Sequence, residues 1–426
     1  MTMQCKRYEN IGEDVWSSQL ENGLRICVVP KKGFSGYYAA LAVNYGGAFR
    51  NFTVDGKYVT TPAGVAHYLE HKMFDMPDGV SAIQKLSADG ADPNAFTSAG
   101  ETCYYFQCTK NFEENLKTLI EFVTTPYFTE ETVKKEQGII AQEISMDADD
   151  PGSAIYYNLL KLLYENHPIR DEVAGTHESI AQITAETLYD CHKVFYSPVN
   201  MALCVEGDVD PDRVEQIARE LLPAERAPMP TADFGEKESE YPKELHISRC
   251  MSVSAPQFLF GARFEGGRGE RALREHIIAQ LALRMLVGYA SPFYTRLYAQ
   301  GLLNRDFSYD TDYSANTATV FIGGESSDPE KVLSELKAEI KKVNAGGFDP
   351  EVFARAKKAS FGARLRGFEN FESVCLSLAD GMFEGFDSFT APEVLADVGI
   401  EECEEFVARV LDEKKLAVSI IMPVKE

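Results

Sequence analysis

The chain has 426 residues, is 45% hydrophobic, and carries a formal net charge of −24 from 42 basic and 66 acidic residues. This length allows two or more domains with substantial cores. The acidic balance argues against nucleic-acid binding, which depends on a positive surface. It would suit basic peptide substrates if the acidic groups line a cavity, although an ordinary soluble surface explains it equally well.

No membrane span or export signal is expected. No apolar run approaches the length of a membrane helix, and the first ten residues lack the apolar core of a signal peptide. The nine cysteines form no paired framework; Cys103 and Cys108, the closest pair, fall in a probable strand. These features predict a cytoplasmic protein with reduced thiols.

Strands and helices alternate in the first half of the chain. Apolar and β-branched runs predict strands at 24–30, 36–45, 102–108 and 199–205, and apolar periodicity predicts helices at 111–124, 129–146 and 210–222. A further helix should begin at Thr61-Pro62, because a threonine N-cap followed by proline is a helix start signal. Strands that alternate with helix pairs indicate an α/β sandwich, in which helices pack on a sheet.

The segment 223–244 is rich in proline and charge and is interpreted as a linker. After it the order of elements recurs, with strands expected at 258–264, 316–323 and 416–422 and helices at 275–287, 328–343 and from 349 onward. We therefore expect two similar domains, 1–222 and 245–426. Gly266-Gly267-Arg268-Gly269 lacks the lysine and hydroxyl residue of a phosphate-binding loop and is interpreted as a turn.

The most informative motif is His67-Tyr68-Leu69-Glu70-His71, which lies in the helix expected after Pro62. Residues at i, i+3 and i+4 share a helix face, so His67, Glu70 and His71 can point into one pocket. Two imidazoles are good zinc ligands, and a carboxylate beside them can take a proton from zinc-bound water. The alternative is a pair of surface histidines on an amphipathic helix.

A third zinc ligand should come from another element, since catalytic zinc usually has three protein ligands. Glu136 and Glu143 lie seven residues apart on one face of the helix that follows Thr129. Either could reach the metal, and the other could hold a histidine or the water from behind. Taken alone, the two carboxylates could equally belong to a solvated helix face.

The H-x-x-E-H motif followed by E-x6-E resembles the inverzincin (pitrilysin) zinc peptidases, which include insulin-degrading enzyme and mitochondrial processing peptidase. The resemblance implies that His67, His71 and Glu143 bind zinc, that Glu70 is the general base, and that Glu136 supports the ligands without touching the metal. It also implies an α+β fold of two homologous sandwich domains, with helices packed on a mostly antiparallel sheet: a zinc-binding catalytic N-terminal domain and a C-terminal copy without the motif.

Chains of this length in the family resemble half of a clamshell that pairs with a second, homologous subunit. Glu70-His71-Lys72-Met73-Phe74 is similar to a bacterial subgroup named for an association with elongation factor P aminopentanol modification, a name that says little about substrate. The segment from Gly90 to Ser98 matches the family's N-A-x-T edge strand, so Asn94 and Ala95 are expected to contact the substrate backbone. The alternative for this segment is an ordinary turn into the next strand.

The stretch from Ser291 to Tyr309 resembles the family segment that supplies an arginine and a tyrosine to the substrate. Tyr309 matches the tyrosine. The arginine is expected at the position of Leu302; Arg305 or Arg296 could substitute for it, but neither has the matching register. In some bacterial relatives the zinc motif and the arginine–tyrosine pair lie on different subunits, and Leu302 fits such an arrangement.

Together these features predict a zinc-dependent endopeptidase that hydrolyses short or unfolded peptides in an enclosed dimeric chamber, with Glu70 as base and Tyr309 assisting at the oxyanion. The partner is expected to be a second copy or a homologue that supplies an arginine–tyrosine pair. A peptide-binding or scaffold subunit, active only with a partner homologue, is the alternative. A purely structural zinc protein fits less well, because structural sites favour four closed ligands and cysteine.

Overall fold

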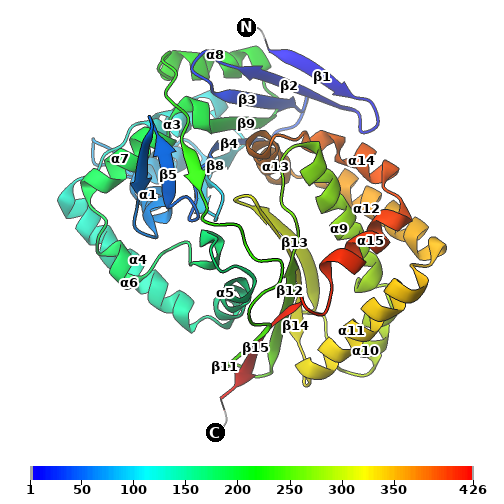
Figure 1. Cartoon of the computed structure of the whole chain (residues 1–426). Helices are drawn as coiled ribbons and strands as arrows, with labels where there is room; N and C mark the ends of the chain where they lie inside the picture. Colours follow the sequence, from blue (N-terminus) through cyan, green and yellow to red (C-terminus); the bar gives the residue numbers. More distant parts are fainter. Residues whose placement is uncertain (1–2, 425–426) are drawn as a thin grey trace. The chain divides into compact units, whose positions relative to one another are not determined.

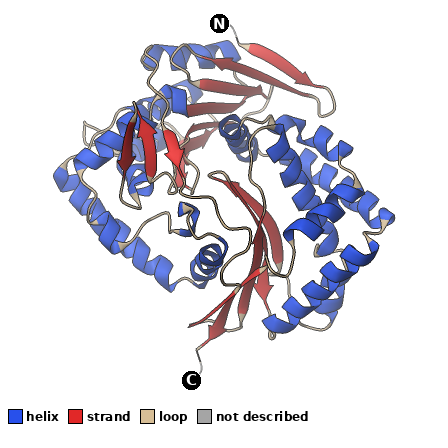
Figure 2. Cartoon of the chain, in the orientation of Figure 1, coloured by secondary structure: helices blue, strands red, loops and turns tan. Residues whose placement is uncertain are grey.

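The computed structural model describes residues 3–424 and divides into two compact units. Unit 1 contains the chain up to Ile144, Asp171–Gly235 and Leu365–Phe389; unit 2 contains Ser145–Arg170, Glu236–Arg364 and the chain from Thr390 onward. Each unit has a sheet covered by helices (Figures 1 and 2).

Unit 1 is built on a seven-stranded sheet in the order β1-β2-β3-β9-β4-β8-β7, in which β3 and β9 are parallel and all other neighbours are antiparallel. A small sheet, β10-β5-β6, accompanies it. The strands are β1 (Gln4–Tyr8), β2 (Glu13–Gln19), β3 (Arg25–Pro30), β4 (Tyr37–Val43), β5 (Asn51–Val54), β6 (Lys57–Thr60), β7 (Ala91–Thr97), β8 (Thr102–Cys108), β9 (Met201–Gly207) and β10 (Thr231–Asp233).

The central strands of this sheet are buried on both faces. Large side chains such as Leu41 and Tyr104 face the main core, whereas alanine and cysteine at Ala40, Ala42 and Cys204 face α13. Small side chains let a helix approach the sheet closely. The helices of unit 1 are α1 (Val65–Met73), α2 (Ala82–Ala88), α3 (Phe112–Thr124), α4 (Glu130–Asp149), which continues into unit 2, α6 (His177–Ile180), α7 (Ala185–Phe195), α8 (Pro211–Leu221) and α13 (Phe371–Glu384).

Unit 2 is built on a five-stranded sheet in the order β11-β15-β12-β14-β13, with β11 and β15 parallel and the other neighbours antiparallel. The strands are β11 (His246–Met251), β12 (Gln257–Arg263), β13 (Ser308–Ser314), β14 (Thr317–Glu325) and β15 (Ala417–Pro423). The helices are α5 (Pro151–Leu163), α9 (Glu270–Leu286), α10 (Pro292–Ala299), α11 (Pro329–Gly346), α12 (Pro350–Gly367), α14 (Ala391–Asp397) and α15 (Ile400–Val410).

The two sheets share one topology. The order β3-β9-β4-β8-β7 in unit 1 recurs as β11-β15-β12-β14-β13 in unit 2, and in both the single parallel pair joins the first strand to the last. The expectation of two homologous domains, each with helices on a mostly antiparallel sheet, is therefore confirmed.

The units differ from the contiguous segments 1–222 and 245–426 because two helices are exchanged. Helix α5 follows α4 in the first copy but packs on β12 and β15, where Gly261 admits the Leu159 side chain. Helix α13 follows α12 in the second copy but packs on β4 and β9 of unit 1. The sequence-based boundaries themselves stay a prediction.

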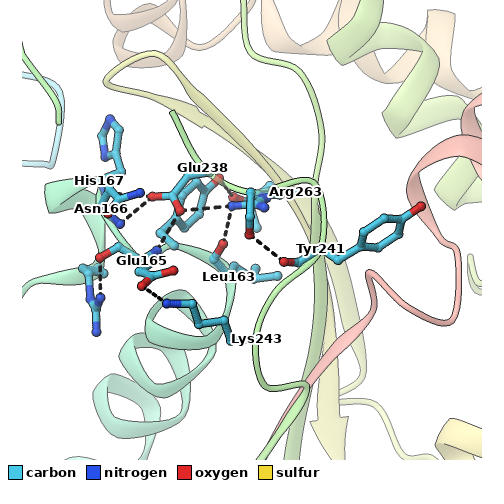
Figure 3. A network of polar contacts seen from close by, with 12 residues as sticks. Leu163, Glu165, Asn166, His167, Glu238, Tyr241, Lys243 and Arg263 are labelled. Carbon is cyan, nitrogen blue, oxygen red and sulfur yellow. Dashed lines mark hydrogen bonds and ion pairs between the residues drawn. The ribbon is translucent and has the colours of Figure 1, made fainter. Parts of the chain in front are cut away.

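The segment 223–244 is ordered along much of its length. Thr231–Asp233 forms β10 and pairs with β5 in unit 1. In unit 2 the Glu238 carboxylate accepts hydrogen bonds from three successive backbone N–H groups, at Glu165, Asn166 and His167, over 2.7–2.9 Å (Figure 3). Arg263 lies 3.4 Å from the same carboxylate. A sequence rich in proline and charge gives no sign of the three hydrogen bonds to Glu238, which join groups more than 70 residues apart.

One predicted helix start is wrong. Helix α1 begins at Val65 and not at Pro62, and its N-cap is Gly64 at φ +94°. A Cβ atom at Gly64 would lie 2.6 Å from the Ala174 carbonyl oxygen, so this close approach requires glycine. The strand at Thr102–Cys108 and the helices capped by Thr129, Asp210 and Asp328 are confirmed.

All nine cysteines are free thiols. Within residues 3–424 no helix combines the length and the apolar character that crossing a bilayer would need.

Glu206 on β9 should make unit 1 less stable at alkaline pH. Its side chain is fully buried, with Lys31 at 3.3 Å, and burial raises its pKa to about 7. A carboxyl group with a raised pKa stabilises the fold at low pH, and this contribution is lost as the pH rises through 7. We expect the free energy of unfolding to fall by about 2–3 kcal/mol between about pH 5 and pH 8 from this residue.

Denaturant unfolding of the wild type and Glu206→Gln at both pH values measures this contribution. Glutamine should remove that part of the pH dependence, whereas Glu9→Gln, at a side chain that is 83% exposed, should keep it. Equal pH dependence in the wild type and Glu206→Gln would contradict the assignment.

Candidate metal centre

Helix α1 turns three functional side chains to one face and packs the other face into the core. Val65, Tyr68 and Leu69 are buried, and His67, Glu70 and His71 occupy the opposite side. The Tyr68 hydroxyl donates a hydrogen bond to the Val133 carbonyl of α4. This bond ties α1 to α4 one turn before Glu136 and thereby sets which residues of α4 face the histidines.

Helix α4 supplies two carboxylates to the histidines. His71 Nδ1 lies 3.0 Å from Glu136 Oε1. His67 Nε2 lies 3.5 Å from Glu143 Oε1, and His71 Nε2 lies 3.6 Å from Glu143 Oε2. Ligand atoms of His67, His71 and Glu143 all lie within 4.8 Å of one another. The structure thus brings together the two histidines and both carboxylates expected from the sequence, and gives the two carboxylates different positions.

The distances around Glu143 fit a bound metal better than direct hydrogen bonds. They exceed the usual N–H···O range of about 2.7–3.2 Å. Ligands about 2.0–2.2 Å from a tetrahedral zinc ion are separated by about 3.4 Å, which is close to the 3.5 and 3.6 Å found here. The donor set of two imidazoles and one carboxylate also suits zinc. His67, His71 and Glu143 are therefore suitable ligands for a zinc ion.

Glu136 contacts the back of His71 and leaves the other ring nitrogen free. With Nδ1 hydrogen-bonded to Glu136, the His71 tautomer presents Nε2 as an electron-pair donor toward Glu143. Burial lowers the pKa of His71, but the hydrogen bond that its Nδ1 donates to Glu136 and the charges of Glu70, Glu136 and Glu143 raise it more, so the net shift is upward. The hydrogen bond to His71 in turn lowers the pKa of Glu136.

Glu70 is held by a threonine that the sequence reasoning did not single out. Thr97 Oγ1 donates a 2.8 Å hydrogen bond to Glu70 Oε2 and lies 3.3 Å from Thr102 Oγ1. Thr102 Oγ1 in turn donates to the Tyr45 carbonyl at 2.8 Å. Thr97 is the threonine of the N-A-x-T segment, so the motif contained the signal, but a role toward Glu70 required knowing that β7 lies beside α1.

Asn94 and Ala95 lie on the edge strand of the unit 1 sheet. Strand β7 pairs with β8 on one side and ends the strand order on the other. The Ala95 N–H donates to the Asn94 side-chain oxygen at 2.9 Å. An extended peptide could take the place of that local hydrogen bond.

Tyr309 and the two substitute arginines, Arg296 and Arg305, lie in unit 2. Tyr309 is half-buried at the start of β13, and burial raises its pKa. Arg296 is engaged with Glu335 at 3.1 Å, and Arg305 is exposed. The arginine whose charge acts on Tyr309 is Arg284 of α9. No local pattern links Arg284 to Tyr309, so this pairing could not be inferred before the tertiary structure was known.

Comparisons with known proteins define the class. A family model described as Insulinase (Peptidase family M16) matches residues 59–177, which include both histidines and all three glutamates. A second, described as Peptidase M16 inactive domain, matches residues 182–360. The chain is 34% identical over 425 residues to an uncharacterized zinc protease of Bacillus subtilis, YmfH, and the match covers 98% of each protein. The chain therefore belongs to peptidase family M16.

Solved structures agree with this assignment. An M16-like peptidase from Alicyclobacillus acidocaldarius superposes with a TM-score of 0.93 at 28% identity, covering 100% of this chain and 99% of that one. Pitrilysin shares the fold with a TM-score of 0.79 at 15% identity, and the match covers all of this chain but 47% of pitrilysin. The protein is thus a half-size member of the family.

The hydrogen bond between Glu136 and His71 can be tested in metal-free protein by NMR titration of the histidine ring. We expect His71 to titrate above 6.5 and its pKa to fall in Glu136→Gln, because the acceptor loses its charge. Glu131→Gln, an exposed position on the same helix, is the matched control and should leave His71 unchanged. The same His71 pKa in wild type and Glu136→Gln would contradict the contact.

Proposed function

We propose that the protein is a zinc-dependent endopeptidase acting on short or unfolded peptides. The observation that carries the proposal is the set of donor separations, 3.5 and 3.6 Å, between Glu143 and the two histidines. Glu70 lies on the same helix face as the two histidines, and Thr97 Oγ1 holds one of its carboxylate oxygens at 2.8 Å. Relatives of this chain are named zinc proteases, which supports a zinc-dependent peptidase.

His67, His71 and Glu143 would hold the zinc ion, and Glu136 would fix the His71 ring. When bound, zinc polarises the scissile carbonyl and acidifies water. Glu70 accepts the proton of the attacking water at its carboxylate and then passes it to the leaving amine. Thr97 holds Oε2 of Glu70 through its hydroxyl, which leaves the other carboxylate oxygen for proton transfer.

The substrate would bind as an added strand on β7. The Ala95 N–H would donate to a substrate carbonyl in place of the Asn94 side chain, and Asn94 would contact the peptide backbone. Recognition through main-chain groups is sequence-tolerant and requires an extended peptide, which favours unfolded or short substrates over folded proteins.

We further propose that a second subunit, a copy or a homologue, completes an enclosed chamber and supplies an arginine–tyrosine pair to the substrate. Coverage of about half of pitrilysin and Leu302 at the expected arginine position support this pairing. They also support the alternative, a peptide-binding subunit that cleaves only with a partner homologue. The nine free thiols suit the reducing cytoplasm, where we place the protein.

The variants Glu70→Gln and Glu143→Gln should distinguish the role of a general base from the role of a zinc ligand. We expect Glu70→Gln to retain one equivalent of zinc and to lose peptide cleavage by a factor of roughly 100 or more, because the general base is removed. Glu143→Gln should lose the metal as well, because a neutral amide is a weak zinc ligand. Metal analysis and cleavage of a mixed peptide library measure both effects.

Wild-type cleavage should stop with a chelator and return with zinc. Full activity of Glu70→Gln would overturn the mechanism. Cleavage that appears only after a partner homologue is added would favour the binding-subunit alternative for the isolated chain.

Thr97→Val should weaken catalysis without displacing the metal. Valine matches the shape of threonine but cannot donate to Glu70, and a hydrogen bond to a charged group contributes about 1.5–3 kcal/mol. We expect kcat to fall by about ten-fold or more with little change in KM and in zinc content. Thr97→Ser, which keeps the hydroxyl, should restore most of kcat. A fall in zinc content in Thr97→Val would show instead that the threonine supports the fold of the metal site.

A further inference from the structure

The repeat relates the metal centre to a specific place in unit 2. In unit 1 the chain passes from β4 through α1 and α2 to the edge strand β7, then through β8 and α3 to α4. In unit 2 it passes from β12 through α9 and α10 to the edge strand β13, then through β14 and α11 to α12. Helices α9 and α12 and strand β13 are therefore the counterparts of α1, α4 and β7, the three elements of the metal centre.

A cavity lies among these three counterparts. It has a volume of about 470 Å³ and is lined by residues of α9, α12 and β13, among them Gln280, Arg284, Tyr309, Ser360 and Arg364. All of them belong to unit 2. Figure 1 shows α9, α12 and β13 in the part of the chain coloured from green to orange.

The charge in this cavity has the opposite sign to that of the metal centre. Two histidines and three carboxylates meet in unit 1, whereas two guanidinium groups, Arg284 and Arg364, line the counterpart. Among residues 3–424 neither arginine has a carboxylate within ion-pair distance, and the cavity's one carboxylate, Asp310, is exposed and accepts the Thr311 N–H. In a chain with a net charge of −24, a pair of cations left without acidic partners is unusual.

The two arginines act on each other and on their surroundings. Burial and then the charge of Arg284 both lower the pKa of Arg364. Burial and then the charge of Arg364 lower the pKa of His276 to about 4, so this histidine adds no charge near neutrality. Arg364 is oriented by a 2.7 Å hydrogen bond from Nη2 to Gln280 Oε1. The Tyr309 phenol, with its raised pKa, stays protonated and can donate.

We propose that this cavity is an oxyanion-binding site, in which Arg284 and Arg364 bind a carboxylate or phosphate group and Tyr309 donates a hydrogen bond to it. An oxyanion between the guanidinium groups would relieve their mutual repulsion and satisfy their planar N–H pairs, a geometry that suits both carboxylate and phosphate. The site shares Tyr309 with the proposed peptidase, but Arg284 and Arg364 have no part in that activity, so anion binding to the two arginines is tested separately from cleavage.

Calorimetric titration of the zinc-free protein tests the proposal, because without metal the oxyanion cannot bind at the zinc position. The probes are inorganic phosphate, acetyl-trialanine with a free carboxylate, and the same peptide as its C-terminal amide, all at one ionic strength set with sodium chloride. We expect saturable binding of phosphate, of the peptide acid, or of both, with the amide about ten-fold weaker or more. Binding of phosphate alone identifies free phosphate as the source; binding of the acid identifies a peptide carboxylate.

Variants assign the binding to the two arginines. Arg284→Met and Arg364→Met should each weaken binding by about ten-fold or more, and the lysine variants, which keep the charge but lose the paired N–H groups, should fall in between. Arg366→Met, on the same helix and exposed, is the matched control and should bind as the wild type does.

The methionine variants should also unfold at the same temperature as the wild type or higher when no anion is present, because one of two like charges is removed. Absence of saturable binding, or equal affinity in the wild type and all arginine variants, would overturn the proposal.

Discussion

The packing of α1 against α4 is the constraint on which the metal centre depends. A nine-residue helix cannot by itself fix what lies opposite its histidines. The buried Tyr68 side chain, whose hydroxyl donates to the Val133 carbonyl, sets the register between the helices. From that register follow the contact of Glu136 with His71 and the position of Glu143 between the two Nε2 atoms. The two glutamates therefore make different contacts: Glu136 lies against His71 Nδ1, and Glu143 lies near Nε2 of both histidines.

The edge strand β7 connects the metal centre with a surface able to bind a peptide. Its end carries Thr97, which holds Glu70, and its middle carries Asn94 and Ala95 at an unpaired edge. One strand thus positions the proposed base and offers main-chain hydrogen-bonding groups. A change in the register of β7 against β8 would disturb both together, because a shift of one residue turns every side chain to the other face.

The repeated fold shows how the same arrangement of elements can hold opposite charges. Helices and an edge strand meet in the same order in both units, and the strand orders agree. The first copy concentrates carboxylates and imidazoles, which attract a cation. The second places Arg284 on α9 and Arg364 on α12, the counterparts of the two helices that carry the histidines and glutamates. The second copy has no H-x-x-E-H motif, and its cavity is lined by polar and charged groups, among them Gln280, Tyr309 and Ser360.

The sequence by itself determined the family, the α+β sandwich and the repeat, and it singled out His67, Glu70, His71, Glu136 and Glu143 as candidate site residues, because helical periodicity and motif spacing are local properties that folding preserves. It could not distinguish the roles of Glu136 and Glu143 from spacing alone, since two residues on one helix face differ only in what the opposing helix presents. It misplaced the start of α1, where a close approach to Ala174 requires Gly64. Only the tertiary structure brought Thr97 to Glu70, exchanged α5 and α13 between the units, and set Arg284 and Arg364 in one cavity, because each of these depends on contacts between residues far apart in the chain.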